Sequence, residues 1–282
     1  MRWRWPRLAV LLLPFVIAGS AMPMTCTGSA AAAAPPTPLA RPLVPPSATP
    51  AGLDSAAVAA EVVGAVHRQS ARAEVGLLVW DRASDSLLVS VDADRRLRSA
   101  SLVKLLIAVR VAGEPGTGSR VTRMLRASDD AAASALWGLH GGDRLPELTG
   151  PVLGLEGLAA PDVPGYWGDT LLSPNDILAT YRYFLRSAPE LVDPMRAAPR
   201  VAADGFDQHF GIPSAFAGPW AVKQAWGSGN GYVAVHTTGV LGAGDRYVVL
   251  LMTNHPSSVS FSRAIASVTA GAKALAAVLP LA

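Results

Sequence analysis

The sequence predicts an α+β fold in which one antiparallel sheet is covered by helices and interrupted by a helical subdomain. Three observations predict it. A helical pattern precedes a strand hairpin, the middle of the chain is helical, and three strand-like segments precede a last helix. The chain has 282 residues, and half of them are hydrophobic. That is enough for one large domain or two small ones.

The first elements are a helix and a hairpin. Asp54 can cap the N-terminus of a helical run, Ser55–Gln69. Residues 75–80 and 86–91 then have the composition of strands, and they flank a polar turn at 82–85. We therefore expect these two strands to pair in antiparallel fashion.

Three helices are predicted in the middle of the chain. Residues 102–112 are apolar enough for a buried helix, and a second helix should run from about Asp130 to Leu139, before two glycines. Ser173-Pro174 is typical of a helix start, because serine caps the N-terminus and proline suits the first position. This third helix should continue to about Arg186.

The last part of the chain returns to strands. Segments 220–225, 231–241 and 246–253 are strand-like, and residues 257–279 form a closing helical pattern. The glycine-rich stretch 227–231 is predicted to be the turn between the first two of these strands.

The N-terminus has the features of an export signal. Three arginines in the first seven residues precede an apolar run at 8–19 and the small residues Gly19-Ser20-Ala21. We expect a signal peptide within residues 1–30, an Ala/Pro-rich linker over 31–52 and a folded domain over 53–282. The protein should therefore be secreted or extracytoplasmic, and we expect a monomer.

Cys26 is the only cysteine, so an internal disulfide is excluded. Its place after the apolar run suggests lipidation and a tether to the outer face of the membrane. However, Pro23-Met24-Thr25 matches poorly the small and aliphatic residues that usually precede a lipidated cysteine. Lipidation of Cys26 and its removal with the signal both stay open.

The charge of the chain argues against nucleic-acid binding. The formal net charge is +3, but residues 1–52 hold four arginines and no acidic residue. The remainder has 20 basic and 21 acidic side chains. A nearly neutral domain has no electrostatic footprint for phosphate backbones.

Lysine is rare in this sequence: against 21 arginines there are only Lys104, Lys223 and Lys273. A buried lysine can lose its proton and act as a base, which arginine cannot do in a protein. Lys273 fits the polar face of the last helix. The other two lysines have neighbours that suggest chemistry.

Ser101-Leu102-Val103-Lys104 stands at the start of the first apolar helix. A spacing of three residues puts the hydroxyl and the amine on one helix face. The helix N-terminus favours a developing oxyanion, and burial lowers a lysine pKa so that the neutral amine can take the serine proton. The alternative is a serine N-cap with an incidental lysine.

Two further motifs follow in order. Ser128-Asp129-Asp130 precedes an alanine-rich helix, and Lys223-Gln224-Ala225 lies on a predicted strand. Each alone fits a helix cap or an exposed strand lysine. Together with the first motif they resemble the Ser-x-x-Lys, Ser-Asp-Asn and Lys-Thr-Gly elements of class A β-lactamases and penicillin-binding proteins.

The resemblance covers roughly residues 54–282 and implies a serine β-lactamase/transpeptidase-like fold with a five-stranded sheet and a shortened helical subdomain. It implies a serine hydrolase that forms an acyl-serine intermediate with β-lactams or related amides. Its implied catalytic residues are Ser101 as nucleophile, Lys104 as activating partner, Ser128 as proton relay, and Asp130. Its implied substrate-binding residues are Lys223, Gln224 and Trp226, with the N–H groups of Ser101 and Trp226 as the oxyanion hole.

The chain departs from the family pattern in several places. Only 27 positions separate Ser101 from Ser128, about half the usual spacing. Asp130 replaces an asparagine, and its carboxylate would raise the pKa of Lys104 and oppose its use as a base. Gln224 and Ala225 replace a hydroxyl residue and a glycine.

The deacylation base is hard to assign. Glu156 is the only glutamate between the segments 153–155 and 167–170, which resemble the two ends of the loop that carries this base in class A enzymes. Without a positioned base an acyl-enzyme persists. The alternatives are therefore a β-lactamase, a D-Ala-D-Ala carboxypeptidase or penicillin-binding protein acting on peptidoglycan, and a binding module that no longer reacts. The five histidines show no close pairing, so we expect no metal or other cofactor.

Overall fold

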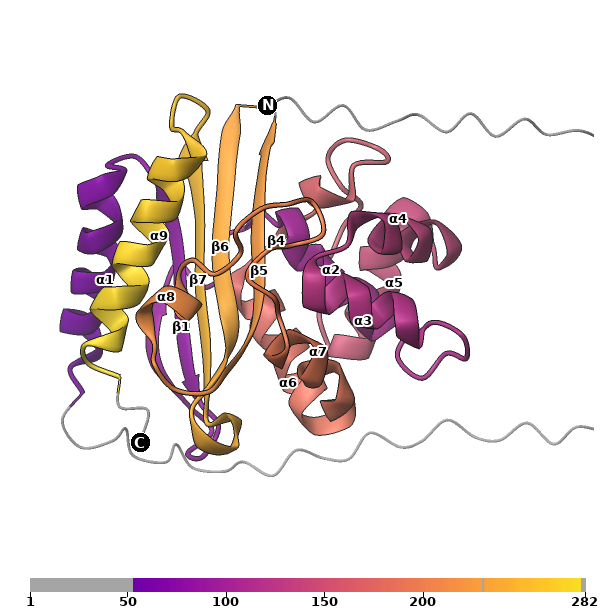
Figure 1. Ribbon diagram of the computed structural model, residues 1–282, viewed down its shortest axis with the longest axis horizontal. Coiled ribbons are helices and arrows are strands. Elements are labelled where there is room, and N and C mark those ends of the chain that lie inside the picture. The colour runs from indigo at the N-terminus through magenta and orange to yellow at the C-terminus, as the bar shows by residue number, and fades with distance from the viewer. Residues whose placement is uncertain (1–52, 230, 280–282) are drawn as a thin grey trace, which may run out of the picture. The chain divides into compact units, whose positions relative to one another are not determined.

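The computed structural model of the chain describes residues 53–229 and 231–279 (Figure 1). The predicted signal peptide, the predicted linker and Cys26 lie outside the described residues. None of the helices in the described part is long and apolar enough to cross a membrane.

A five-stranded antiparallel sheet in the order β2-β1-β7-β6-β5 forms the middle layer (Figure 1). Its strands are β1 (Glu74–Asp81), β2 (Ser86–Val91), β5 (Trp220–Gly229), β6 (Tyr232–Leu241) and β7 (Tyr247–Pro256). A separate small sheet pairs β3 (Leu97–Arg98) with β4 (Leu171–Leu172). The predicted α+β fold and its five-stranded sheet are confirmed.

Helices cover both faces of the large sheet (Figure 1). On one face lie α1 (Ser55–Gln69), α8 (Ile212–Ala215) and α9 (Phe261–Ala276). On the other face lies a helical layer made of α2 (Val103–Arg110), α3 (Gly118–Ala127), α4 (Asp130–Leu139), α5 (Leu145–Leu153), α6 (Pro174–Ser187) and α7 (Val192–Arg196).

Because both faces are covered, the central strands are apolar on both sides. Alternate residues of β7 enter the core under the helical layer, and the residues between them enter the core under α1 and α9. Leu250 belongs to the first core and Leu251 to the second. Gly271 of α9 permits the close approach on the α1 side, since a Cβ there would lie 2.8 Å from Val66 and 2.9 Å from Leu251.

Local capping signals located two helices well. The Asp54 carboxylate accepts hydrogen bonds from two backbone N–H groups of α1, each at 3.0 Å. Ser173 and Asp176 form a reciprocal capping box at the start of α6. Both predicted starts are confirmed.

Three boundaries differ from the predictions. The helix predicted over 102–112 begins as a 3₁₀ turn, Ala100–Leu102, and α2 ends at Arg110. The last helix starts at Phe261, because Ser260 caps it. The turn predicted over 227–231 is wrong in its length, because β5 continues through Gly229, which pairs with Tyr232.

A buried histidine joins β6 to β3. His236 is fully buried; its Nε2 lies 2.7 Å from the carbonyl of Arg98, and its Nδ1 accepts a hydrogen bond from Thr253 N at 3.0 Å. These partners fit a neutral ring with its proton on Nε2. Burial lowers the pKa of His236 to about 4.

We expect the free energy of unfolding to fall as the pH drops from 6.5 to 5. In that window the unfolded chain binds a proton at His236 and the folded chain does not, which costs about 1.5 kcal/mol for this residue. Urea unfolding at several pH values measures the loss. His236→Gln should remove the share of His236 and leave that of His255, whose pKa burial also lowers to about 4. A pH-independent stability in the wild-type chain would contradict the assignment.

Candidate active site

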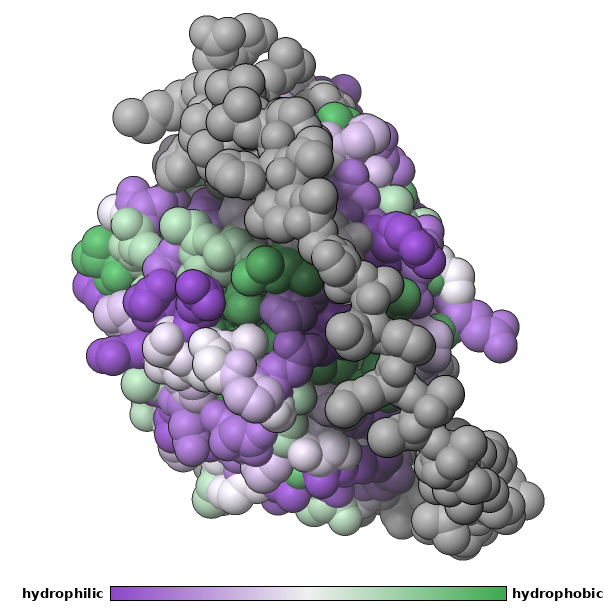
Figure 2. Space-filling model, turned by 90° about the vertical axis from the view of Figure 1, so that its right-hand side faces the viewer, coloured by the Kyte–Doolittle hydropathy of each residue, from purple (hydrophilic) through white to green (hydrophobic). Residues whose placement is uncertain are grey.

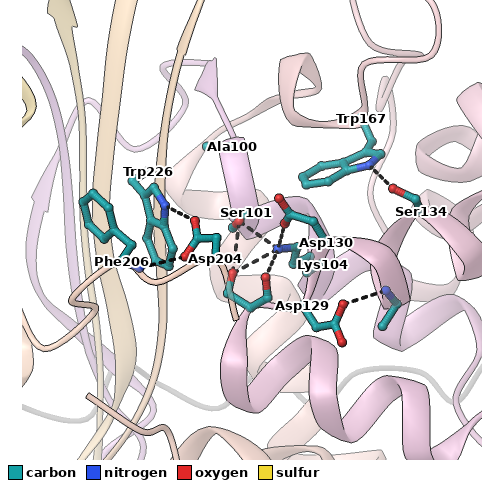
Figure 3. Close-up of polar contacts among 12 residues, drawn as sticks. Ala100, Ser101, Lys104, Asp129, Asp130, Ser134, Trp167, Asp204, Phe206 and Trp226 are labelled. Carbon is teal, nitrogen blue, oxygen red and sulfur yellow. Dashed lines mark hydrogen bonds and ion pairs between the residues drawn. The ribbon is translucent and has the colours of Figure 1, made fainter. Parts of the chain in front are cut away.

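Ser101 lies in the 3₁₀ turn between β3 and α2, and Ala100 before it has an unusual backbone conformation (Figure 3). The φ of Ala100 is 44°, a left-handed value that costs a residue with a Cβ roughly 1 kcal/mol or more. Glycines flank it: a Cβ on Gly227 would lie 3.3 Å from the Cβ of Ala100, and one on Gly168 would lie 3.6 Å from its Cα. Such strain is concentrated at functional sites.

Lys104 follows Ser101 by one helical turn, and its side chain is fully buried. Its Nζ lies 3.0 Å from Ser101 Oγ and 3.0 Å from Ser128 Oγ. It also donates to the carbonyl of Ser128 at 2.7 Å and to Asp130 Oδ1 at 2.5 Å. The three N–H bonds of an ammonium are thus shared among four acceptors from three elements.

The second motif forms the corner between α3 and α4. Ser128 ends α3 with a left-handed φ of 54°, which turns its hydroxyl to within 3.2 Å of Ser101 Oγ. Asp129 caps α4 by accepting from Ala132 N at 2.9 Å, and Asp130 is the first residue of that helix. The short spacing between Ser101 and Ser128 is accommodated because α3 runs directly into this corner.

Lys223 comes from β5 and completes the cluster. It is 1% exposed, and its Nζ donates to Ser128 Oγ at 3.0 Å and to the carbonyl of Gln224 at 2.7 Å. The structure therefore brings the side chains of Ser101, Lys104, Ser128, Asp130 and Lys223 together.

The two buried amines differ in their electrostatic surroundings. Burial lowers the pKa of Lys104, and the carboxylate of Asp130 opposes that shift by stabilising the ammonium. Burial holds the pKa of Lys223 well below its ordinary value, and the charge of Lys104 lowers it further. Asp130 thus opposes the loss of a proton from Lys104, whereas Lys223 is the more readily neutral of the two.

Gln224 does not join this cluster. Neighbouring residues of a strand point to opposite faces, and Gln224 is buried on the face away from Lys223. Its amide nitrogen donates to the carbonyls of Gln208 at 3.2 Å and Phe210 at 2.6 Å. The structure therefore does not bring the Gln224 side chain to the cluster around Ser101, and the predicted substrate contact lacks this support.

Trp226, Phe206 and Asp204 form a side wall of the candidate site, and the sequence predicted only Trp226 as part of the site. Its ring stacks on Phe206 at 4.5 Å, and its Nε1 donates to Asp204 Oδ2 at 3.0 Å (Figure 3). Asp204 lies in a turn between α7 and α8, and its charge acts on both Lys104 and Lys223. The Asp204-Gly205 pair could have predicted a turn, but nothing in the sequence placed that turn beside Ser101.

The loop around Glu156 presents an aromatic ring to the cluster. The ring of Trp167 lies 5.2 Å from Lys104 Nζ, and its Nε1 donates to Ser134 Oγ at 3.2 Å. Glu156 itself is exposed to solvent. Two other carboxylates of this loop, Asp162 and Asp169, lie against Arg98 at 2.6 and 4.0 Å.

The surface of the helical layer mixes hydrophilic and hydrophobic residues (Figure 2). In the described part of the chain, no group of three His, Cys, Asp or Glu side chains could hold a metal ion. The arrangement offers a hydroxyl beside two amines and a second hydroxyl, groups that can exchange protons through hydrogen bonds.

Comparison with known proteins decides the family. No family model matches the sequence. The chain is 31% identical over 212 residues to the protein named "Putative lipoprotein LppW" in Mycobacterium tuberculosis and in Mycobacterium bovis, an alignment that covers 68% of this chain and 67% of that protein. The chain belongs to the LppW family.

Solved structures show the fold of this LppW family member. A class A β-lactamase from Mycobacterium abscessus matches with a TM-score of 0.61 and 18% identity, over 77% of this chain and 97% of that one. An ancestral class A β-lactamase matches with a TM-score of 0.61 and 16% identity, over 77% and 98%. The chain has a β-lactamase-like fold, as the sequence motifs predicted.

We expect Asp130→Asn to lower the pKa of Lys104, because the amide no longer stabilises the ammonium. Lysine side chains labelled with ¹³C at Cε can be titrated by NMR, and the chain has only three lysines to assign. The Lys273 signal serves as an internal control that should not move. An unchanged or raised Lys104 pKa would show that the pair is not coupled as its 2.5 Å distance indicates.

Proposed function

We propose that this protein is an extracytoplasmic serine hydrolase that forms an acyl-serine intermediate, with Ser101 as the nucleophile. The observation that carries the proposal is the contact of Ser101 Oγ with Lys104 Nζ at 3.0 Å and with Ser128 Oγ at 3.2 Å. Two hydroxyls and an amine within hydrogen-bond reach can take the proton from the attacking hydroxyl and deliver a proton to the leaving group of the substrate.

In the proposed acylation, Ser101 Oγ attacks the carbonyl carbon of an amide or β-lactam. Its proton passes to the unprotonated Lys104 amine as the Oγ–C bond forms. The C–N bond then breaks, the leaving nitrogen takes a proton from Ser128, and the Lys104 ammonium returns a proton to Ser128. Lys104 must therefore lose its own proton first, and Asp130 makes that step costly.

The oxyanion is proposed to bind the N–H groups of Ser101 and Trp226. β5 is the last strand of the sheet, so one row of its backbone groups faces away from β6. The carbonyl of Gln224 accepts a hydrogen bond from Lys223 Nζ, and we therefore assign it to the row that faces away from β6. Trp226 stands two residues further along, so its N–H points to the same side.

We propose that the acyl-enzyme is long-lived, which favours penicillin binding or a peptidase over rapid β-lactam hydrolysis. Trp167 covers Lys104 from the loop where a class A enzyme would carry its deacylation base, and Glu156 points to solvent. A deacylation water would have to be activated by the Lys104–Asp130 pair, in which the carboxylate opposes deprotonation of the amine.

We expect wild-type protein to form a covalent adduct with a penicillin or a neutral activated ester, visible by intact-mass spectrometry and persisting for minutes or longer. Ser101→Ala should abolish it, and Lys104→Met should slow its formation by about a hundredfold or more, because the general base is lost. Ser119→Ala, an exposed serine on α3, is the matched control. An adduct that survives Ser101→Ala would place the nucleophile at another residue, and the lack of an adduct with any reagent would favour an unreactive binding module.

The proposed location follows from the N-terminal pattern and from the lipoprotein named in the relatives. We propose that Cys26 carries the lipid. The full chain expressed in an actinobacterial host should partition into the detergent phase of a phase-separating detergent, and Cys26→Ser should move it to the aqueous phase. Equal partition of both forms would indicate secretion without a lipid anchor.

A further inference from the structure

The wall beside Ser101 carries a fixed negative charge. Both carboxylate oxygens of Asp204 are held, one by Trp226 Nε1 at 3.0 Å and the other by Phe206 N at 3.0 Å. Phe206 in turn stacks on Trp226, which fixes the turn against β5. In the view of Figure 3 the Asp204 carboxylate is drawn between the Trp226 indole and Ser101, and its charge acts on the buried amines of Lys104 and Lys223.

The charges nearest to Ser101 do not favour a substrate anion. The ammonium of Lys104 is paired with Asp130 at 2.5 Å, so this pair has no net charge. The amine of Lys223 is buried, and it already donates to Ser128 and to a backbone carbonyl. Asp204 is exposed and its hydrogen-bond donors are neutral, so its charge is not cancelled by them.

We propose that Asp204 is a specificity-determining residue that disfavours a carboxylate beside the scissile bond and selects an amide or ester with an ammonium or uncharged group there. An exposed carboxylate whose hydrogen-bond donors are neutral attracts a cation and repels an anion. A carboxylate in the same place would meet the charge of Asp204, while Lys104 is already paired with Asp130 and Lys223 already donates to Ser128 and to a backbone carbonyl. This inference rests on the proposed role of Ser101 and names the substrate class.

A matched set of probes tests the charge preference. Benzylpenicillin carries a carboxylate, its methyl ester is neutral, and its diethylaminoethyl ester is a cation, while the reacting ring is the same. The second-order rate of adduct formation with wild-type protein should follow the order cation, neutral ester, carboxylate. Each charge step should change the rate by about fivefold at low salt, and less at high salt, because an exposed charge is screened.

The loop provides a matched control for Asp204. Asp207 also accepts a backbone N–H two residues further on, at 3.0 Å, but its charge is paired with Arg200 at 2.9 Å. In Asp204→Asn the three probes should form adducts at similar rates, because the adduct-formation rate of the carboxylate probe rises. Asp207→Asn should preserve the order.

Binding to Ser101→Ala separates this inference from the proposed function. NMR titration of the Trp226 indole resonance reports binding without any acylation. The same order of affinities, lost in Asp204→Asn, would support the role of Asp204 even if wild-type protein formed no adduct. A carboxylate probe that reacts and binds as well as the two esters would overturn the inference. So would an order unchanged by Asp204→Asn, or no binding of any probe.

Discussion

The buried amine of Lys104 is the interaction on which the candidate site depends. A buried charge must be paired and hydrogen-bonded, because otherwise its burial lowers the stability of the fold by several kcal/mol. Lys104 satisfies this requirement with Ser101 on its own helix turn, the backbone and hydroxyl of Ser128, and the carboxylate of Asp130. The need to pair one ammonium therefore fixes the corner between α3 and α4 against the start of α2.

The same pairing limits the chemistry that the site can perform. A carboxylate beside Lys104 stabilises the fold locally but holds the proton that the amine would need to lose. Within the described residues no carboxylate lies in ion-pair contact with Lys223, and its burial favours the neutral form. Asp204 adds a negative charge to the proposed site of this LppW family member. The proposed site is therefore less suited to an anionic substrate than to a neutral or cationic one.

Local signals predicted much of the fold because they act over a few residues. Asp54 and Ser173 cap their helices as expected, since a cap is a contact between near neighbours. Helix α5 was not predicted, because Gly150 and Pro151 inside it are signals against a helix and only burial of its apolar face overrides them. The extension of β5 through Gly229 likewise depends on pairing with β6, which local sequence does not encode.

The sequence by itself determined which residues form the candidate site, because Ser101, Lys104, Ser128 and Lys223 stand in motifs whose types and order resemble those of known serine acyl-enzymes. It also showed that the Asp130 carboxylate opposes the use of Lys104 as a base. Only the tertiary structure decided that Gln224 faces away and that Asp204 stands beside Ser101. The physical reason is that the face of a strand side chain and the approach of a distant turn are set by packing across the sheet, not by neighbours in sequence.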